Sequence, residues 1–389
     1  MARLSGRRDF LWSLAAANCL DARPPFRIRW REGPEYPLGI QDSAFAILDG
    51  RVISAGGFTR WPKDSVAKYP DLFGGAKNGF THATFIFDPR HEARGWARIG
   101  NIPGPRRQAA AAAVAGGALY AIGGFNYDAP YTYRSVYRLK PGPGDWRWED
   151  VPAELPWPVC EAGVGVIGRV IYLICGADFC PQPGHPDCDF NIVGRRGQPV
   201  GRSILSLDTA NPRAGWRQVT QIPGTPRFDT CATAAAGKIY VFSGVHREPS
   251  PKPGGYSNVV DAWSFDVATS RWERLADLPH RSNQHAVTYR DRYLLLLGAY
   301  RYGATRRIDG SLQEVYTPEE KKRDWKQFFE PAVVVYEIRT RQLSETDPLL
   351  DATSYPMAAM DGDTIYVLGG EGGKRLWQPA TFHIGHIEK

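Results

Sequence analysis

The sequence is poor in the features that mark helical, membrane-spanning and nucleic-acid-binding proteins. Its 389 residues include only three Met, and long apolar stripes with the 3.6-residue helical period are nearly absent, which argues against a helical fold. No stretch approaches the roughly 20 consecutive apolar residues of a membrane span. The net charge of +7 comes without a long run of Lys and Arg, so we expect no nucleic-acid partner.

Signature motifs of several enzyme classes are also missing. We find no phosphate-binding Gly-rich loop, no G-x-S-x-G nucleophile elbow and no H-E-x-x-H zinc motif. The chain is rich instead in turn and strand formers, with 41 Gly, 31 Pro and 12% aromatic residues. This composition is typical of many short strands joined by turns, and it predicts an all-β fold.

The N-terminal residues differ in character from the rest of the chain. Arg7-Arg8 stand before a short apolar run that ends in the small residues Ala15–Ala17, a pattern that resembles a twin-arginine export signal. We therefore predict that residues 1–22 are an export signal or a disordered tail and that 23–389 form one domain. The protein is accordingly expected to be periplasmic or secreted.

One pattern recurs six times along the predicted domain. Each copy has a strand of small residues, a tight turn, an apolar strand that ends in Gly, a longer loop, and a third strand. The closing glycines are residues 57, 124, 176, 244, 298 and 370, so successive spacings are 67, 52, 68, 54 and 72. The alternation predicts longer loops in alternate copies. A single four-stranded unit cannot bury both of its faces, so the copies should close into a circle of blades.

A Trp marks the start of the fourth strand in the first four copies, at Trp96, Trp146, Trp216 and Trp272. The fifth copy has Gln342–Glu345 where a Trp is expected, and the sixth ends without a fourth strand. A matching segment, Phe26–Trp30, stands at the other end of the chain. We predict a six-bladed β-propeller in which this N-terminal strand completes the C-terminal blade.

The Gly-Gly doublets, the Tyr in the second strand and the spaced Trp resemble kelch repeats over about residues 26–387. Among kelch-type β-propellers, the chain is similar to the exported bacterial sialic acid mutarotases (N-acetylneuraminate epimerases). The similarity rests on Pro103–Gln108, the long insertion Gly303–Glu330 and the segment Leu368–Glu371. It implies mutarotase or epimerase activity on a small acidic sugar or glycan, without a cofactor.

The same resemblance implies a Glu directly after the glycine that closes the second strand of blade four, with an Arg a few residues on. This sequence has Val245 at that position, followed by His246, Arg247 and Glu248. Glu248 with Arg247 is the nearest equivalent, although its register differs.

In a propeller, the loops that lead into the first strand and out of the second converge on one mouth of the central channel. An acidic sugar there needs Arg to bind its carboxylate, aromatic faces to cover its pyranose, and carboxylates or His to move protons. The predicted catalytic residues are Glu371, His285 and Glu248. The predicted substrate-binding residues are Arg106, Arg227, Asp229, Arg247, Arg301, Tyr127, Asp178, Tyr300 and Tyr355.

Several of these candidates have a structural alternative. Arg106 and Arg227 each follow a proline, and a repeated position of this kind either binds substrate or bonds to the carbonyls of a neighbouring blade. Asp229 and Glu161 either face the mouth or brace adjacent loops. His285 is either catalytic or an ordinary strand residue.

Two cysteines, Cys180 and Cys188, close a loop rich in Pro and Gly. In an exported protein this arrangement predicts a disulfide. The alternative is a metal site made of Cys180, His185, Asp187 and Cys188, but a second ligand pair of metal-site spacing is missing, so we predict no metal.

The fold alone leaves three classes of function open. The leading hypothesis is an exported, carbohydrate-active propeller with mutarotase or epimerase activity. The second is a lyase or hydrolase of acidic glycans that uses His285 or Tyr355. The third is a non-catalytic protein-interaction module.

Overall fold

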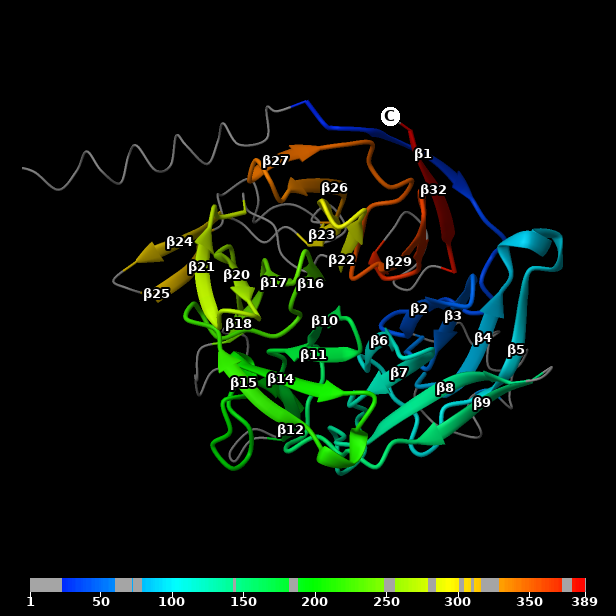
Figure 1. Ribbon diagram of the computed structural model, residues 1–389, viewed down its shortest axis with the longest axis horizontal. Coiled ribbons are helices and arrows are strands. Elements are labelled where there is room, and N and C mark those ends of the chain that lie inside the picture. Colours follow the sequence, from blue (N-terminus) through cyan, green and yellow to red (C-terminus); the bar gives the residue numbers. More distant parts are fainter. Residues whose placement is uncertain are drawn as a thin grey trace, which may run out of the picture.

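The computed structural model describes residues 23–59, 72, 79–142, 145–181, 188–247, 256–278, 285–300, 304–308, 311–315, 329–372 and 380–388. Within them, six four-stranded antiparallel sheets stand around a common centre (Figure 1). This arrangement confirms the six-bladed β-propeller that the repeats predict. Residues 1–22, the proposed export signal, lie outside the described residues.

Each blade is a meander whose strands follow one another from the centre outwards. Blade one contains β2 (Ala44–Leu48), β3 (Arg51–Ala55), β4 (Ala83–Phe87) and β5 (Trp96–Asn101). Blade two contains β6 (Ala111–Ala115), β7 (Ala118–Ile122), β8 (Val136–Gly142) and β9 (Asp145–Asp150). Blade three contains β10 (Gly163–Ile167), β11 (Val170–Ile174), β14 (Ser203–Asp208) and β15 (Arg217–Gln221).

The second half of the circle repeats this order. Blade four contains β16 (Ala232–Ala235), β17 (Lys238–Val241), β20 (Ala262–Asp266) and β21 (Arg271–Leu275). Blade five contains β22 (His285–Tyr289), β23 (Tyr293–Tyr300), β26 (Phe329–Glu337) and β27 (Gln342–Glu345). Blade six contains β29 (Met357–Asp361), β30 (Thr364–Leu368), β32 (Phe382–Glu388) and β1 (Arg27–Glu32).

Small residues dominate the innermost strands because these strands crowd together. β6 reads AAAVA and β10 reads GVGVI, and each inner strand contacts the inner strands of both neighbouring blades, with β29 returning to β2. The second strands are buried on both faces, as in β7, where all residues are buried. Apolar residues on both faces suit a strand that is covered by a blade on either side.

The N-terminal strand closes the circle as predicted. β1 pairs antiparallel with β32, from Arg27 opposite Glu388 to Glu32 opposite His383, and the two strands run side by side at the rim in Figure 1. Phe26 and Ile28 are buried, and the ring of Phe26 meets the edge of Tyr289 in blade five at 5.4 Å. Strand pairing therefore fastens β1 to β32 within blade six, and apolar packing of Phe26 fastens it to blade five.

Tryptophan indoles of the outer strands join each of several blades to the one before it. The N–H of Trp216 donates to the carbonyl of Ala153 at 2.9 Å, and that of Trp272 donates to Thr220 Oγ1 at 3.1 Å. Trp96 and Trp30 make equivalent bonds to Pro34 and Asp347. In blade two the donor is Trp148, which bonds to Thr84 Oγ1.

The sequence pattern pointed to Trp146 for this role in blade two. Trp146 lies two residues earlier on β9 and is approached by the guanidinium of Arg51 at 5.9 Å. Because successive side chains in a strand alternate between faces, both Trp residues share one face, and the second of them reaches the preceding blade.

The remaining elements lie in the connections between blades and strands. Among the described residues, three two-stranded pairs lie in loops that leave second strands: β12 (Asp178–Pro181) with β13 (Cys188–Asn191), β18 (Gly244–Arg247) with β19 (Tyr256–Val259), and β24 (Ala304–Ile308) with β25 (Ser311–Val315). A fourth pair joins β28 (Thr353–Ser354), in the loop that enters blade six, to β31 (Glu371–Gly372), in the loop that leaves its second strand. The 3₁₀ helices are η1 (Pro89–Arg94), η2 (Val200–Arg202) and η3 (Pro212–Ala214). A search of the described residues for a helix of membrane-spanning length and hydropathy finds none.

Candidate functional site

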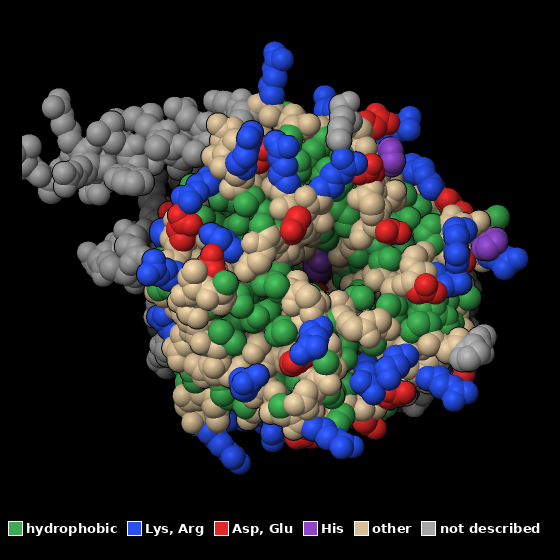
Figure 2. All heavy atoms as spheres, in the orientation of Figure 1, with side chains coloured by type: hydrophobic (Ala, Val, Ile, Leu, Met, Phe, Trp, Pro, Cys, Tyr) green, Lys and Arg blue, Asp and Glu red, His purple; other side chains and the backbone are tan. Residues whose placement is uncertain are grey.

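A central channel of about 420 Å³ runs between the inner strands of all six blades. A second cavity of about 230 Å³ lies at one end of it. The two share four lining residues, Asp42, Glu161, Asp229 and Tyr355, so this cavity is the mouth of the channel. Figure 2 shows the surface hollowed at the centre of the circle of blades.

The shared residues occupy one repeated position of the fold. In five blades the residue just before the inner strand has a left-handed backbone. We call these residues the mouth positions: Asp42 (φ 52°), Ala109 (φ 52°), Glu161 (φ 53°), Asp229 (φ 48°) and Tyr355 (φ 50°). A left-handed backbone is uncommon outside glycine and costs of order 1–2 kcal/mol. The blade imposes this conformation, and in each of these five blades it directs one side chain toward the axis.

The closing glycines predicted from the sequence explain how the blade imposes the left-handed backbone at the mouth positions. Gly57 and Gly124 have φ values of 104° and 90°. A Cβ on Gly57 would lie 2.7 Å from the carbonyl oxygen of Gln41, and one on Gly124 would lie 2.8 Å from that of Gln108. Only glycine permits the second strand to pass this close to the residue before each mouth position.

Four carboxyl groups and a phenol meet at the mouth. The hydroxyl of Tyr355 donates to Asp229 Oδ2, and Glu161 makes a side-chain hydrogen bond with Asp229. Asp42 accepts a bond from Gln41 Nε2 at 2.8 Å. Glu371 follows the closing glycine of blade six and lines the same cavity. Asp229 is thus an acceptor held between two donors.

Crowding of carboxylates away from water separates their pKa values. Burial, and then the neighbouring charge of Glu371, raise the pKa of Asp42 to about 8. Burial also raises the pKa of Asp229, but bonds from Glu161 and Tyr355 limit it to about 6. Burial and the charge of Asp229 raise the pKa of Glu161 well above its usual range. Near pH 7 the cluster therefore contains an ionised Asp229 next to protonated acids, an arrangement suited to proton transfer.

Aromatic side chains form the wall of the cavity on the side of blades two and three. Phe125, Phe179 and Phe190 line it together with Tyr127. Phe125 and Phe179 have ring centroids 4.5 Å apart, and Phe179 and Phe190 have theirs 4.9 Å apart. Tyr127 is 48% exposed, and its ring centroid lies 5.7 Å from that of Phe179, so the wall presents an aromatic surface to the cavity. Such a surface suits the apolar face of a sugar.

The structure brings four of the predicted site residues to this mouth: Glu371, Asp229, Tyr355 and Tyr127. His285 begins the inner strand of blade five and lines the channel. Burial lowers the pKa of His285 to about 4, so its imidazole is neutral at physiological pH and is suited to hydrogen bonding rather than to carrying charge.

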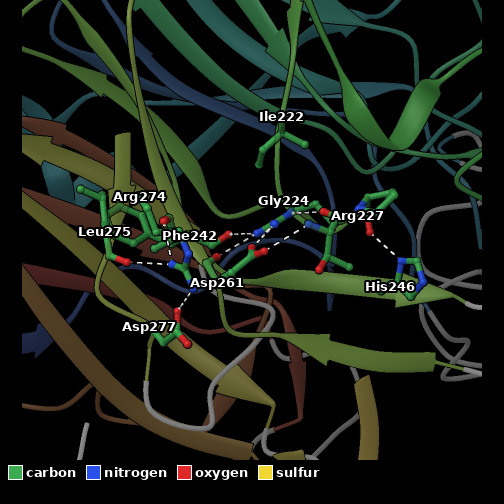
Figure 3. Close-up of polar contacts among 12 residues, drawn as sticks. Ile222, Gly224, Arg227, Phe242, His246, Asp261, Arg274, Leu275 and Asp277 are labelled. Carbon is green, nitrogen blue, oxygen red and sulfur yellow. Dashed lines mark hydrogen bonds and ion pairs between the residues drawn. The ribbon is translucent and has the colours of Figure 1, made fainter. Parts of the chain in front are cut away.

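Arg227 lies away from the cavity. It is fully buried, and its guanidinium donates to the carbonyls of Thr225, Phe242 and Asp261 and pairs with the carboxylate of Asp261 (Figure 3). Arg227 therefore braces its own blade four, and not a neighbouring blade as the structural alternative had it. Its counterpart in blade two is Arg107, because Gln108 and Phe228 hold equivalent bridges to the exit strand.

Arg107 shows the same bracing with other partners. It donates to the carbonyls of Pro105 and Gly123, and its guanidinium lies over Tyr133 at 4.4 Å. Arg106 is half-buried next to His82, and its charge is one reason that the pKa of His82 is lowered, after burial.

Two other predicted binding residues also lie in supporting positions. Asp178 is fully buried and binds Arg195, with Nε at 2.8 Å and Nη2 at 2.9 Å. Arg247 is buried at the end of β18 and approaches the carbonyl of Phe190. Both therefore hold the hairpins at the rim of the mouth.

The remaining predictions fall outside the described residues. These are Glu248, Arg301 and the side chains of Tyr300 and Cys188. On β12 and β13, Cys180 lies opposite Asp189, and Pro181 lies opposite Cys188, so the Cys180–Cys188 disulfide stays a prediction. Within the part of the chain that the structure describes, no group of three or more His, Cys, Asp or Glu is placed to hold a metal ion.

The sequence predicted Glu161 either to face the mouth or to brace a loop, and it assigned no role in the site to Asp42 or Gln108. Their signal is positional. Each mouth position stands opposite a closing glycine, two or three residues before a strand of small residues. The left-handed backbone that makes this position important is invisible in residue identity, because Asp, Ala, Glu and Tyr all occupy it.

Comparisons with known proteins agree with this architecture. No protein-family model matches the chain. It is 34% identical over 101 residues to an N-acetylneuraminate epimerase of Yersinia enterocolitica, covering 25% of this chain and 26% of the relative. It is also 34% identical over 98 residues to N-acetylneuraminate epimerase 1 of Escherichia coli, covering 23% and 26%. The matches thus span about a quarter of these relatives.

The likeness in three dimensions extends over the whole circle of blades. The solved structure of YjhT superposes with a TM-score of 0.61 at 13% identity, covering 91% of this chain and 95% of that one. At this identity the superposition concerns the fold. The chain is a six-bladed β-propeller similar to the N-acetylneuraminate epimerases.

Proposed function

We propose that the protein interconverts the anomers of a sugar at the mouth of its channel, with an acidic sugar of the sialic acid type as the first substrate to test. The observation that carries the proposal is the cluster of Asp42, Glu161 and Asp229, in which the pKa of Asp229 is about 6 and that of Asp42 is about 8, on opposite sides of neutrality. The similarity to N-acetylneuraminate epimerases supports the choice of substrate.

The reaction needs two proton transfers at one carbon. A base removes the proton of the anomeric hydroxyl, an acid protonates the ring oxygen, and the bond between that oxygen and the anomeric carbon breaks to leave a carbonyl. Rotation and reclosure with the opposite transfers give the other anomer without net gain or loss of atoms. We assign the base to Asp229, which is ionised near pH 7, and the acid to protonated Asp42.

The other cavity residues position the sugar. Tyr355 and Glu161 hold the Asp229 carboxylate by donating to it. The aromatic wall with Tyr127 covers one face of the pyranose, in the manner expected of rigid aromatic contact surfaces. Protonation of Asp42 and Glu161 removes two of the negative charges that would otherwise repel an acidic substrate. Arg301 and Glu248 stay candidates for contacts to the sugar carboxylate.

Anomer exchange measured by NMR tests the proposal. Freshly dissolved N-acetylneuraminate and glucuronate should equilibrate faster with the protein than without it. Asp229→Asn should remove at least nine-tenths of the acceleration, because loss of a general base typically costs about 100-fold or more. Asp361→Asn is the matched control, because Asp361 is exposed at the opposite end of an inner strand.

Two results would contradict the proposal. Unchanged exchange rates for both sugars would remove it, and so would equal acceleration by Asp229→Asn and the unmodified protein. Release of new reducing ends from acidic glycans would instead favour the lyase or hydrolase alternative.

The proposed location is outside the cytoplasm, and it rests on the paired arginines at positions 7 and 8. Fractionation of bacteria that express the full chain should place it in the periplasm or medium. Changing Arg7→Lys and Arg8→Lys together should retain it in the cytoplasm, because twin-arginine export reads that pair. Equal export of both forms would contradict the assignment.

A further inference from the structure

Blade two breaks the pattern of the mouth. At the mouth positions of blades one, three and four stand Asp42, Glu161 and Asp229, whereas blade two has Ala109. All four residues line the channel. Because the backbone conformation is shared, the space that a carboxylate fills in the other blades is left open beside Ala109.

Gln108, the residue before Ala109, lacks the carboxylate partner that Gln41 has in blade one. Gln41 and Gln108 hold the same bridge to the strand that leaves the blade, opposite Phe58 and Phe125. Gln41 Nε2 donates to the carboxylate of Asp42 at 2.8 Å. Ala109 offers Gln108 no such group.

Gln108 also has an unpaired amide oxygen inside the site, and this oxygen is an acceptor, unlike the Nε2 donor that Gln41 uses. Gln108 is only 4% exposed and lines the 230 Å³ cavity. Its Oε1 is buried without a hydrogen-bond partner among the described residues. A buried amide oxygen in this state costs about 1–3 kcal/mol, and most buried polar atoms in native proteins are satisfied. The missing partner is accordingly expected to be a ligand.

We propose that Gln108, Ala109 and the adjoining aromatic side chains of Phe125 and Tyr127 form a sugar-binding subsite on blade two. Gln108 Oε1 accepts a hydrogen bond from a hydroxyl or amide N–H of the sugar, whose body fills the space beside Ala109. The aromatic side chains cover the apolar face of the same sugar. This assignment rests on the proposed sugar ligand and adds the group that orients it.

The subsite makes Gln108 a positioning residue rather than a proton carrier. Gln108 should influence the affinity for the sugar more than the rate at which the bound sugar reacts. An amide oxygen that contacts a group remote from the reacting carbon stabilises the ground state and the transition state equally. The Michaelis constant should therefore rise while kcat changes less than twofold.

Calorimetric titration with N-acetylneuraminate, glucuronate and N-acetylglucosamine tests the subsite. Gln108→Met preserves size but removes the acceptor, and it should weaken binding of the tightest of these sugars about five- to tenfold. Gln221→Met is the matched control, because Gln221 is exposed on the outer strand of blade three. It should bind as the unmodified protein does.

A second variant keeps the test valid if Gln108→Met fails to fold. Ala109→Asn places an amide in the open space next to Gln108, and Asn tolerates a left-handed backbone better than Ala does. Its melting temperature should be unchanged or higher, while its affinity for the sugar falls at least tenfold.

The outcomes separate the subsite from the proposed activity. Affinities within twofold of the unmodified protein for both variants overturn the subsite, even if anomer exchange is accelerated. Gln108-dependent binding without accelerated exchange supports the subsite and removes the activity. Failure of all three sugars to bind the unmodified protein overturns both.

Discussion

At the scale of single residues, the mouth combines a demanding backbone with unfavourable charge. Asp42 and Asp229 adopt left-handed conformations, and burial raises the pKa of each. Both features cost folding free energy, and residues that carry such costs cluster at functional sites. Neutralising one carboxylate should therefore stabilise the protein even as it removes activity.

The first prediction concerns stability. The pKa of Asp42 is about 8 in the folded protein and near 3.8 when unfolded, so between these values the folded state binds more protons and its stability falls as pH rises. The Asp42→Asn variant has no carboxyl group to ionise at this position, so it does not lose this stability as pH rises. Its melting temperature should exceed that of the unmodified protein at pH 8 and match it near pH 4, as followed by circular dichroism. A pH-independent difference would contradict the assigned pKa.

The second prediction concerns the pH dependence of activity. Asp229 acts as a base only when ionised, so catalysed exchange should fall below about pH 6. Asp42 acts as an acid only when protonated, so exchange should also fall above about pH 8. The excess rate over the uncatalysed reaction should be bell-shaped, with apparent pKa values that belong to the coupled cluster. A rate that climbs steadily with pH would contradict these roles.

At the scale of strands and loops, buried guanidinium groups of Arg107 and Arg227 hold the mouth loops of blades two and four against their blades. Arg227 donates to three backbone carbonyls and to the Asp261 carboxylate. Asp229 stands two residues later in the same loop, so this brace sets the direction of a catalytic side chain without touching the cavity.

The third prediction tests the brace. Asp261→Ala leaves a buried charge without its counter-ion, which typically costs 3–5 kcal/mol. Urea denaturation should show a loss of about 3 kcal/mol. Asp277→Ala removes the exposed partner of Arg274 (Figure 3) and should cost less than about 1 kcal/mol. Equal effects of the two changes would argue against a bracing role.

The elements were largely predictable, and the site was predictable only in part, for one physical reason. Crowded positions in the fold accept only Gly or other small residues, so the steric constraint is visible in the sequence. This is why β6, β10 and the N-terminal strand β1 of blade six could be predicted. Arg227 and Asp229 stand two residues apart, yet one is buried in a brace and the other faces the cavity. That difference comes from backbone dihedrals, which the residue types do not encode.

At the scale of the whole molecule, the circle of blades has one covalently open joint, in blade six, where β1 pairs with β32. Asp347 of blade five strengthens this joint by accepting from the backbone N–H of Ile28 at 2.7 Å and by binding Arg27. Because every blade packs on two neighbours, opening one joint should weaken all of them.

The fourth prediction removes the joint. Deletion of residues 1–32 should lower the melting temperature by about 10 °C, because the burial of Phe26 and Ile28 alone contributes about 4 kcal/mol. Deletion of residues 1–22 is the control and should leave the melting temperature unchanged. Adding a synthetic peptide of residues 23–34 should restore part of the loss by pairing with β32. A shorter chain as stable as the control would show that blade six is complete without β1.

The mouth positions also bear on how such a protein changes over generations. Five blades each supply one residue at the channel mouth from a backbone that the blade itself fixes, and Asp, Ala, Glu and Tyr are all accommodated there. A single codon change at any of these positions alters the chemistry of the pocket while the strands behind it stay as they are. Descendants of one propeller can therefore diverge in substrate by small mutational steps, without passing through unfolded intermediates.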